Sequence, residues 1–269
     1  MELITTHTHT GFCGHGEGTV AELVTAARSE GITTLAITEH FPLSQAFDPQ
    51  DFLAMPASRL EEYIADVEKE RARHSDIEIL LGCEFDWLGD DEDRDITPSD
   101  LDRFEIIMGS VHFVDTWAFD DPAQRGRWEQ VGADEIWKRY FEIWCKCVLS
   151  DMPFTVMSHP DLVKKFGYLP SFDPTPLYRD AAEAVRAAGR MVEVNTSGSY
   201  YPCAEMFPTH ALLTEFCRAG VPCTVGTDAH APHLVARDIE KGYRALYEAG
   251  YREVTVPTRD RGRRSITIE

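Results

Sequence analysis

The amino-acid sequence predicts an α/β barrel that forms a single domain over residues 1–269. Two observations predict this fold: β-rich runs alternate with helical stretches, and most β-rich runs end in a residue that can bind a metal. The length also suits one barrel, since a barrel of parallel strands typically needs about 250 residues. The chain has no internal repeat and no linker rich in Pro, Gly or Ser, so one domain is expected.

Seven short runs have the composition of buried strands. In chain order they read ELITTHTH, TTLAITEH, IEILLGCEFD, FEIIMGSVHF, FTVMSHPD, MVEVNTSG and CTVGTDAH. Helical spacing of apolar residues lies between or after them, over residues 19–30, 58–73, 134–150, 176–188, 209–219 and 234–249. Four of these stretches are followed by a glycine suited to a left-handed helix end: Gly31, Gly189, Gly220 and Gly250. This alternation indicates right-handed βαβ units and a parallel sheet.

Candidate metal ligands lie at the ends of six of the seven runs. One more, His15, lies in the loop after the first run. They are His7, His9, His15, His40, Glu84, His112, His159, Asp228 and His230. In a parallel barrel the carboxyl ends of the strands converge on one face, whereas an open sheet would spread them along an edge. The distribution therefore favours a closed barrel with a metal site at the C-terminal ends of its strands.

The number and type of these ligands predict more than one metal. His7 and His9 are two apart on a strand, as are Asp228 and His230, so each pair leaves one face of its strand. Nine ligands are too many for one ion but suit two or three ions that share a carboxylate. The mixed set suits Zn²⁺, Mn²⁺ or Fe²⁺. Two histidines in or beside helical stretches are expected at the surface: His74 and His210.

Composition limits the partners. The net charge of −20 disfavours binding to nucleic acid, so a small molecule is the expected partner. No apolar stretch approaches the roughly 20 residues of a membrane span, and no signal-peptide pattern opens the chain, so a cytoplasmic location without a membrane partner is expected. The seven scattered cysteines indicate no disulfide framework. The basic run RDRGRR at 259–264 is expected to be a solvated tail. The sequence predicts no oligomeric state.

Together the motifs resemble those of the PHP (polymerase and histidinol phosphatase) superfamily. The matching pieces are HTH at 7–9, His15, TEH at 38–40, GCE at 82–84, GSVH at 109–112, SHPDL at 158–162, NTSG at 195–198 and GTDAH at 226–230. The resemblance implies a distorted (β/α)7 barrel with a trinuclear metal site, in agreement with the seven predicted strands. It implies one metal on His7, His9, Glu84 and Asp228, a second on Glu84, His112 and His159, and a third on His15, His40 and His230.

Within the superfamily the chain looks most like stand-alone histidinol-phosphate phosphatases. This implies hydrolysis of L-histidinol phosphate to histidinol and phosphate, a step of histidine biosynthesis, by a hydroxide that bridges two metals. Glu84, Asp228 and His230 would be catalytic. Asp161 would either protonate the leaving group or orient a ligand histidine.

The expected substrate contacts come from segments next to the motifs. These phosphatases usually carry an Arg after NTSG, which we associate with phosphate recognition, but here the chain reads SYYPCAEMFPT. Lys164 and Lys165 are the basic alternatives, unless they form a solvated helix start. Asn195 and Ser197 are expected to bind the substrate or groups behind the ligands, and Tyr200 to wall the substrate.

Three rival functions stay open at this point. The first is a PHP-type phosphoesterase that acts on another small phosphate ester or a nucleotide. The second is a hydrolase of the amidohydrolase type, which the third set of ligands argues against. The third is a structural module without activity, which the presence of all nine ligands argues against.

Overall fold

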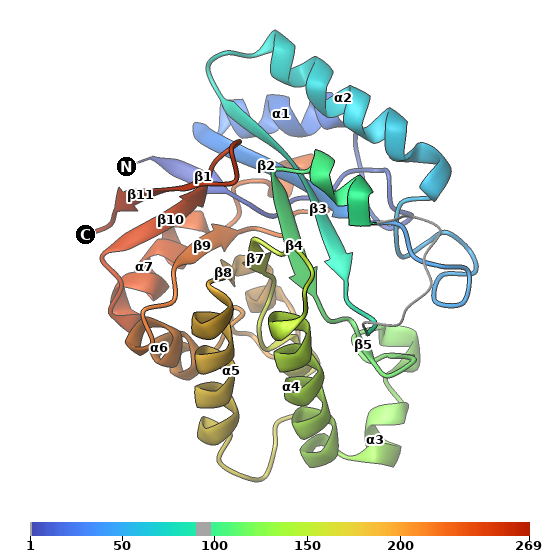
Figure 1. The fold of residues 1–269 in the computed structure, drawn as a ribbon, viewed down its shortest axis with the longest axis vertical. Coiled ribbons are helices and arrows are strands. Elements are labelled where there is room, and N and C mark those ends of the chain that lie inside the picture. Colours follow the sequence, from blue (N-terminus) through green and yellow to red (C-terminus); the bar gives the residue numbers. More distant parts are fainter. Residues whose placement is uncertain (1, 90–97) are drawn as a thin grey trace.

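The computed structural model describes residues 2–89 and 98–269, and a seven-stranded parallel sheet forms its centre. Each strand pairs with the next along the chain, which confirms the predicted alternation (Figure 1). The strands are β1 Leu3–Thr5, β2 Ile32–His40, β3 Glu78–Asp86, β4 Ile106–Ser110, β7 Val156–Met157, β8 Met191–Asn195 and β9 Cys223–Gly226.

Backbone hydrogen bonds between the first and last strand regions close the sheet into a barrel. The N–H of Thr6 donates to the carbonyl oxygen of Val225 over 3.0 Å, and the N–H of Asp228 donates to that of His7 over 2.9 Å. The barrel is uneven, because β2 and β3 have nine residues each whereas β7 has two. A distorted (β/α)7 barrel is therefore confirmed.

Helices cover the outside of this barrel. In Figure 1, α1 and α2 lie on one side of the strands, and α4 and α5 lie on the opposite side. The six expected helices are present, and the short helix α3 is an addition that the sequence did not predict. The four expected glycines all have positive φ, from 66° to 112°. The helices are α1 Val20–Ser29, α2 Leu60–Arg73, α3 Arg127–Val131, α4 Ala133–Leu149, α5 Thr175–Ala188, α6 His210–Arg218 and α7 Ile239–Ala249.

Two hairpins complete the fold. The strands β5 Phe113–Val114 and β6 Trp117–Ala118 form one hairpin, and β10 Glu253–Pro257 and β11 Arg263–Thr267 form the other. The run RDRGRR is not a solvated tail, contrary to the expectation, because it contains the turn of the second hairpin and enters β11. Its arginines bind the body of the protein: Arg264 forms an ion pair with Glu2, and Arg261 donates to the carbonyl oxygen of Phe104 over 3.0 Å.

The inner face of the barrel changes from apolar to polar along its strands. A separate buried apolar cluster fills the part of the barrel that precedes the carboxyl ends of the strands. Its members are Ala36, Leu80, Ile106, Met108, Val156 and Met191. Successive residues of a strand alternate between its faces, so His40 shares a face with Ala36, and Glu84 shares one with Leu80. The ligands therefore lie directly above this packed floor. No helix in the described ranges is both long enough and apolar enough to cross a membrane.

Candidate metal centre

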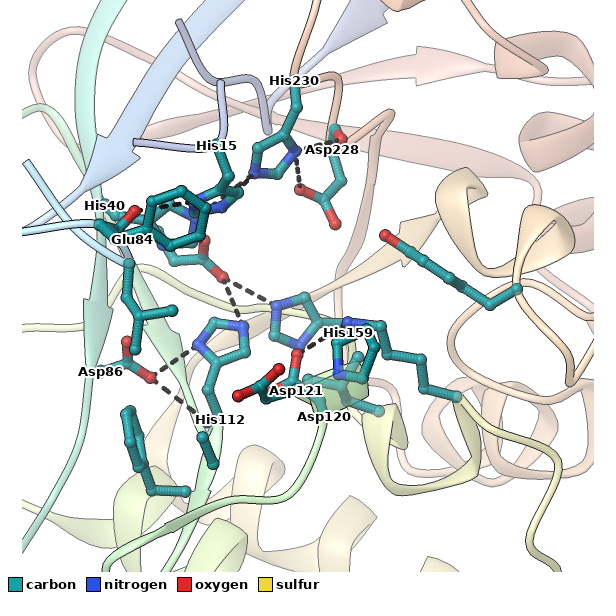
Figure 2. A pocket seen from close by; sticks show the side chains of 18 of the residues that line it. His15, His40, Glu84, Asp86, His112, Asp120, Asp121, His159, Asp228 and His230 are labelled. Carbon is teal, nitrogen blue, oxygen red and sulfur yellow. Dashed lines mark hydrogen bonds and ion pairs between the residues drawn. The ribbon is translucent and has the colours of Figure 1, made fainter. Parts of the chain in front are cut away.

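A cavity of about 490 Å³ opens at the carboxyl ends of the strands, where the sequence predicts the metal site. Its lining combines imidazoles and carboxylates with an apolar rim. The ionisable lining residues are His15, His40, Glu84, Asp86, His112, Asp120, Asp121, His159, Lys165, Asp228, His230 and Arg237. Figure 2 shows the histidines and Glu84 around one central space.

Four side chains from the regions of β1, β3 and β9 form the innermost group: His7, His9, Glu84 and Asp228. The Nε2 atoms of His7 and His9 are 3.0 Å apart. Glu84 Oε2 lies 3.3 Å from His7 Nε2 and 3.4 Å from His9 Nε2. Asp228 Oδ1 lies 3.6 Å from His7 Nε2 and 3.3 Å from His9 Nε2. Ligand atoms from both ends of the sequence thus surround one point.

These spacings fit a divalent cation. Ligands at about 2.0–2.1 Å from a tetrahedral Zn²⁺ are separated from each other by about 3.3 Å. The five distances given above, from 3.0 to 3.6 Å, centre on that value. His7 Nδ1 faces a carboxylate, so Nε2 is the ring nitrogen left for a metal at the central point. A cation or a proton at this point is needed to offset the repulsion between nitrogen atoms 3.0 Å apart.

Glu84 also reaches a second group. Its Oε1 lies 2.8 Å from His159 Nε2 and 3.7 Å from His112 Nε2, whereas its Oε2 belongs to the first group (Figure 2). One carboxylate therefore faces two candidate ion positions with different oxygens. Burial alone would raise the pKa of Glu84, but the neighbouring imidazoles, His7 foremost, hold that pKa well below its usual range. Glu84 is consequently ionised and has the geometry of a bridging ligand.

A third group lies towards the mouth of the cavity. His230 Nε2 is 3.1 Å from His15 Nε2 and 3.4 Å from His40 Nε2. Burial lowers the pKa of His230 to about 3 and holds that of His40 well below its ordinary value, so both imidazoles are neutral at pH 7. Cys13 Sγ lies within reach of the same point, a neighbour that sequence reasoning did not identify as a candidate ligand.

Carboxylates behind the imidazoles set the direction of the rings. Glu193 Oε1 lies 3.0 Å from His7 Nδ1, Asp86 Oδ1 lies 2.7 Å from His112 Nδ1, and Glu39 Oε1 lies 3.5 Å from His9 Nδ1. A carboxylate at Nδ1 fixes the tautomer that presents Nε2 to a metal. Sequence reasoning missed all three carboxylates. A signal was present, because Asp86 is two residues after Glu84 and Glu193 two before Asn195, on the inward faces of their strands.

Asn195 and Ser197 form hydrogen bonds with the candidate metal ligand Asp228 and do not line the cavity. The Asn195 amide and the Ser197 hydroxyl each donate to Asp228 Oδ2 over 3.2 Å. Both side chains are buried, and neither is among the described residues that line the cavity. Of the two roles expected from the sequence, the structure supports contact with groups behind the ligands and not contact with a substrate.

Asp161 and Lys164 form a buried ion pair away from the cavity. Lys164 Nζ lies 3.1 Å from Asp161 Oδ2 and 3.0 Å from Glu205 Oε2, and it donates to the carbonyl oxygen of Met206 over 2.7 Å. Asp161 also accepts the N–H of Thr209 over 2.8 Å. Neither side chain belongs to the described lining. The structure therefore supports neither alternative expected for these residues: Asp161 binds Lys164 and Thr209 instead of reaching the cavity or a ligand histidine, and Lys164 is buried instead of reaching the cavity or the solvent.

Lys165 and Tyr200 do line the cavity, as expected. Lys165 Nζ forms an ion pair with Asp120 over 2.9 Å and lies 4.8 Å from the centre of the Tyr201 ring. The hydroxyl of Tyr200 donates to Asp238 over 2.8 Å. His74 and His210 lie outside the cavity; His74 faces Glu70 on α2.

A closed parallel barrel with adjoining groups of imidazole and carboxylate ligands at its mouth is typical of a metal-dependent hydrolase. Residues 5–197 match the PHP domain family, and the chain belongs to this family. A probable histidinol-phosphatase of Deinococcus radiodurans is 30% identical to the chain, over 94% of this chain and 96% of that protein.

Two further comparisons concern Lactococcus lactis. Its histidinol-phosphatase is 24% identical, over 94% of each chain. A crystal structure of histidinol phosphate phosphatase from that organism, in complex with zinc, L-histidinol and phosphate, superposes with a TM-score of 0.77. The superposition covers 96% of this chain and 97% of that one at 21% identity, which shows that the fold is shared.

Proposed function

We propose that this protein is a phosphomonoesterase that hydrolyses L-histidinol phosphate with the help of two to three divalent metal ions. The observation that carries the proposal is the position of Glu84, whose two oxygens face two separate groups of imidazoles. The names of the relatives support the substrate, since the D. radiodurans protein is a probable histidinol-phosphatase. We further propose that residues 1–269 act as one domain.

The three ligand groups would hold the metals as the resemblance implies. His7, His9, Glu84 and Asp228 would bind one ion, Glu84 with His112 and His159 a second, and His15 with His40 and His230 a third. Donor chemistry favours Zn²⁺, Mn²⁺ or Fe²⁺ over Mg²⁺ and Ca²⁺, because every group contains at least two imidazoles.

The residues around the metals prepare the cavity for a phosphate ester. When bound, the ions supply a nucleophilic hydroxide at neutral pH and offset the negative charge of the phosphate. Without them the carboxylates of Glu84 and Asp228 would repel a dianion at this point. Glu193, Asp86 and the pair formed by Asn195 and Ser197 hold the ligand side chains in place, so the reacting groups need little rearrangement.

The expected partner is this small, charged ester. The net charge of −20 supports the absence of a nucleic-acid substrate. The cytoplasmic location expected from the sequence stays a prediction.

The decisive experiment measures phosphate release by purified protein that has been stripped with a chelator and reloaded with Zn²⁺, Mn²⁺ or Fe²⁺. We expect histidinol phosphate to have the highest kcat/KM in a panel of sugar phosphates, nucleotides and a phosphodiester. Glu84→Gln should lower kcat more than about 10²-fold while the circular dichroism spectrum is retained. A higher kcat/KM for another monoester would assign a different substrate, and failure to hydrolyse any phosphoester would refute the proposed activity.

A further inference from the structure

Arg237 lies at the wall of the cavity, just before α7, and the mechanism above leaves it without a role. It lines the same cavity as Asp228 and His230. Its guanidinium carbon lies 4.0 Å from the centre of the Tyr200 ring, so the planar cation stacks on an aromatic face.

Arg237 lies near the carboxylate of Asp238 but forms no close ion pair with any described residue. Lys164 is paired with Asp161 and Glu205, and Lys165 is paired with Asp120. No ion pair of Arg237 with a carboxylate is found in residues 2–89 and 98–269. Its Nε is buried and has no hydrogen-bond partner there. A buried donor without an acceptor is costly, which indicates a position prepared for an acceptor that arrives from outside.

The position of Arg237 is fixed from both sides. The Thr196 hydroxyl donates to the carbonyl oxygen of Arg237 over 2.7 Å. Tyr200 carries the stacked guanidinium, and the Tyr200 hydroxyl is itself anchored on Asp238. Asp238 is paired with Lys241 at 2.8 Å. The backbone of Arg237 and the plane of its stacked guanidinium are therefore fixed, whereas its Nε has no hydrogen-bond partner among the described residues.

We infer that Arg237 binds the phosphate group of the substrate through this edge, which rests on the proposed phosphatase function. A guanidinium offers two parallel N–H donors that match two phosphate oxygens. Arg237 lines the same cavity as His230 and Asp228, so a phosphate held there would share this cavity with the candidate metals. Lys165 is already paired with Asp120, whereas Arg237 forms no ion pair within the described residues and can pair with a phosphate.

The test measures the binding of inorganic phosphate to metal-loaded protein by calorimetry. Arg237→Gln should raise the Kd for phosphate about 10- to 100-fold, because hydrogen bonds to a charged group are lost. Arg237→Lys keeps the charge but loses the paired donors, so its Kd for phosphate should lie between those of the wild type and Arg237→Gln. The matched control is Arg252→Gln: Arg252 also stacks on a tyrosine, at 4.3 Å from the ring of Tyr247, but it lies outside the cavity lining. This control should bind phosphate like the wild type.

Metal content and steady-state kinetics separate the possible causes. Arg237 contributes no metal ligand, so the metal content of Arg237→Gln should equal that of the wild type, and KM should rise more than kcat falls. An unchanged Kd for phosphate in both Arg237 variants would overturn the inference. If the wild type binds phosphate through Arg237 but does not hydrolyse histidinol phosphate, the inference holds and the proposed substrate fails.

Discussion

The carboxylate of Glu193 lies 3.0 Å from Nδ1 of His7, on the side of the ring opposite to Glu84. Glu193 is fully buried, and its Oε1 also accepts the N–H of His159 over 2.8 Å. One carboxylate in the middle of β8 thus holds a ligand of the first group and the backbone of a ligand of the second. Glu193 couples the two candidate metal positions without contacting either.

This arrangement predicts a specific effect of Glu193→Gln. The amide removes the negative charge that orients and polarises His7, so the affinity for Zn²⁺ should fall about 10- to 100-fold. Competition with a chromogenic chelator measures this affinity. Glu248→Gln, a change on the exposed face of α7, serves as the control and should leave the affinity unchanged. Equal affinities in the two variants would contradict the role of Glu193.

The buried pair of Lys164 and Asp161 predicts a change in stability and not in chemistry. Lys164→Met leaves the Asp161 carboxylate buried without its cation, which should lower the free energy of unfolding by about 3–5 kcal/mol. Urea denaturation of the metal-loaded protein measures this loss. At a temperature where the variant stays folded, kcat should be within about twofold of the wild type. A large fall in kcat at unchanged stability would restore a direct role for this pair in the reaction.

The histidines divide into ligands and surface residues, and two alanine variants test the division. His40→Ala removes one of three imidazoles of the third group, so the protein should retain about one metal ion fewer per chain. His74→Ala should keep the full metal content and change the free energy of unfolding by no more than about 0.5 kcal/mol. Elemental analysis after gel filtration measures both. Metal loss in His74→Ala would show that the histidines are wrongly sorted.

Metal binding should release protons at neutral pH. Burial alone would lower the pKa of His9, but the carboxylates of Asp228 and Glu39 raise it to about 9; likewise, Asp86 and Glu84 raise the pKa of His112 to about 10. In the metal-free protein both imidazoles are therefore protonated at pH 7, and a metal must displace these protons. Calorimetry in buffers of different ionisation enthalpy should detect the release, and the affinity for Zn²⁺ should rise between pH 6 and pH 8.

The same pKa values fix the sign of a stability change in the metal-free protein. Both groups have a folded-state pKa above the ordinary value of 6.5, so their stabilising contribution is complete below that pH. It is lost as the pH rises through 9 and 10. A melting temperature of the metal-free protein that rises between pH 8 and pH 10 would contradict this assignment.

Much of the fold and most of the ligand set follow from local patterns. The seven β-rich runs and the six helical stretches are periodic over enough residues to be recognised, and the glycines after them mark helix ends. His40 and Glu84 are recognisable because each ends its strand, where a parallel barrel gathers side chains. The hairpin of β10 and β11 was missed because its basic residues suggest a solvated tail, and only the contacts of Arg261 and Arg264 reveal that they bind the body of the protein.

The environment of single charged residues is harder to predict from sequence. Lys164 and Lys165 are adjacent, yet one is buried in an ion pair and the other lines the cavity, because the turn of η4 Leu162–Lys164 sends them to different sides. Glu193 precedes the NTSG motif without belonging to it, and Arg237 occurs in a stretch without a distinctive motif. Their roles depend on neighbours that are distant in the sequence, such as His7 for Glu193 and Tyr200 for Arg237.

The barrel is closed by a seam of backbone hydrogen bonds between the regions of β1 and β9, and this seam has a consequence for biosynthesis. His7 and His9 leave the ribosome early, whereas Asp228 emerges only after nearly all of the barrel has been translated. A nascent chain that ends near residue 197, where the family match ends, already contains the whole HTH motif but neither Asp228 nor the strand that completes the seam. All four ligands of the first ion can therefore come together only after translation has passed the last strand.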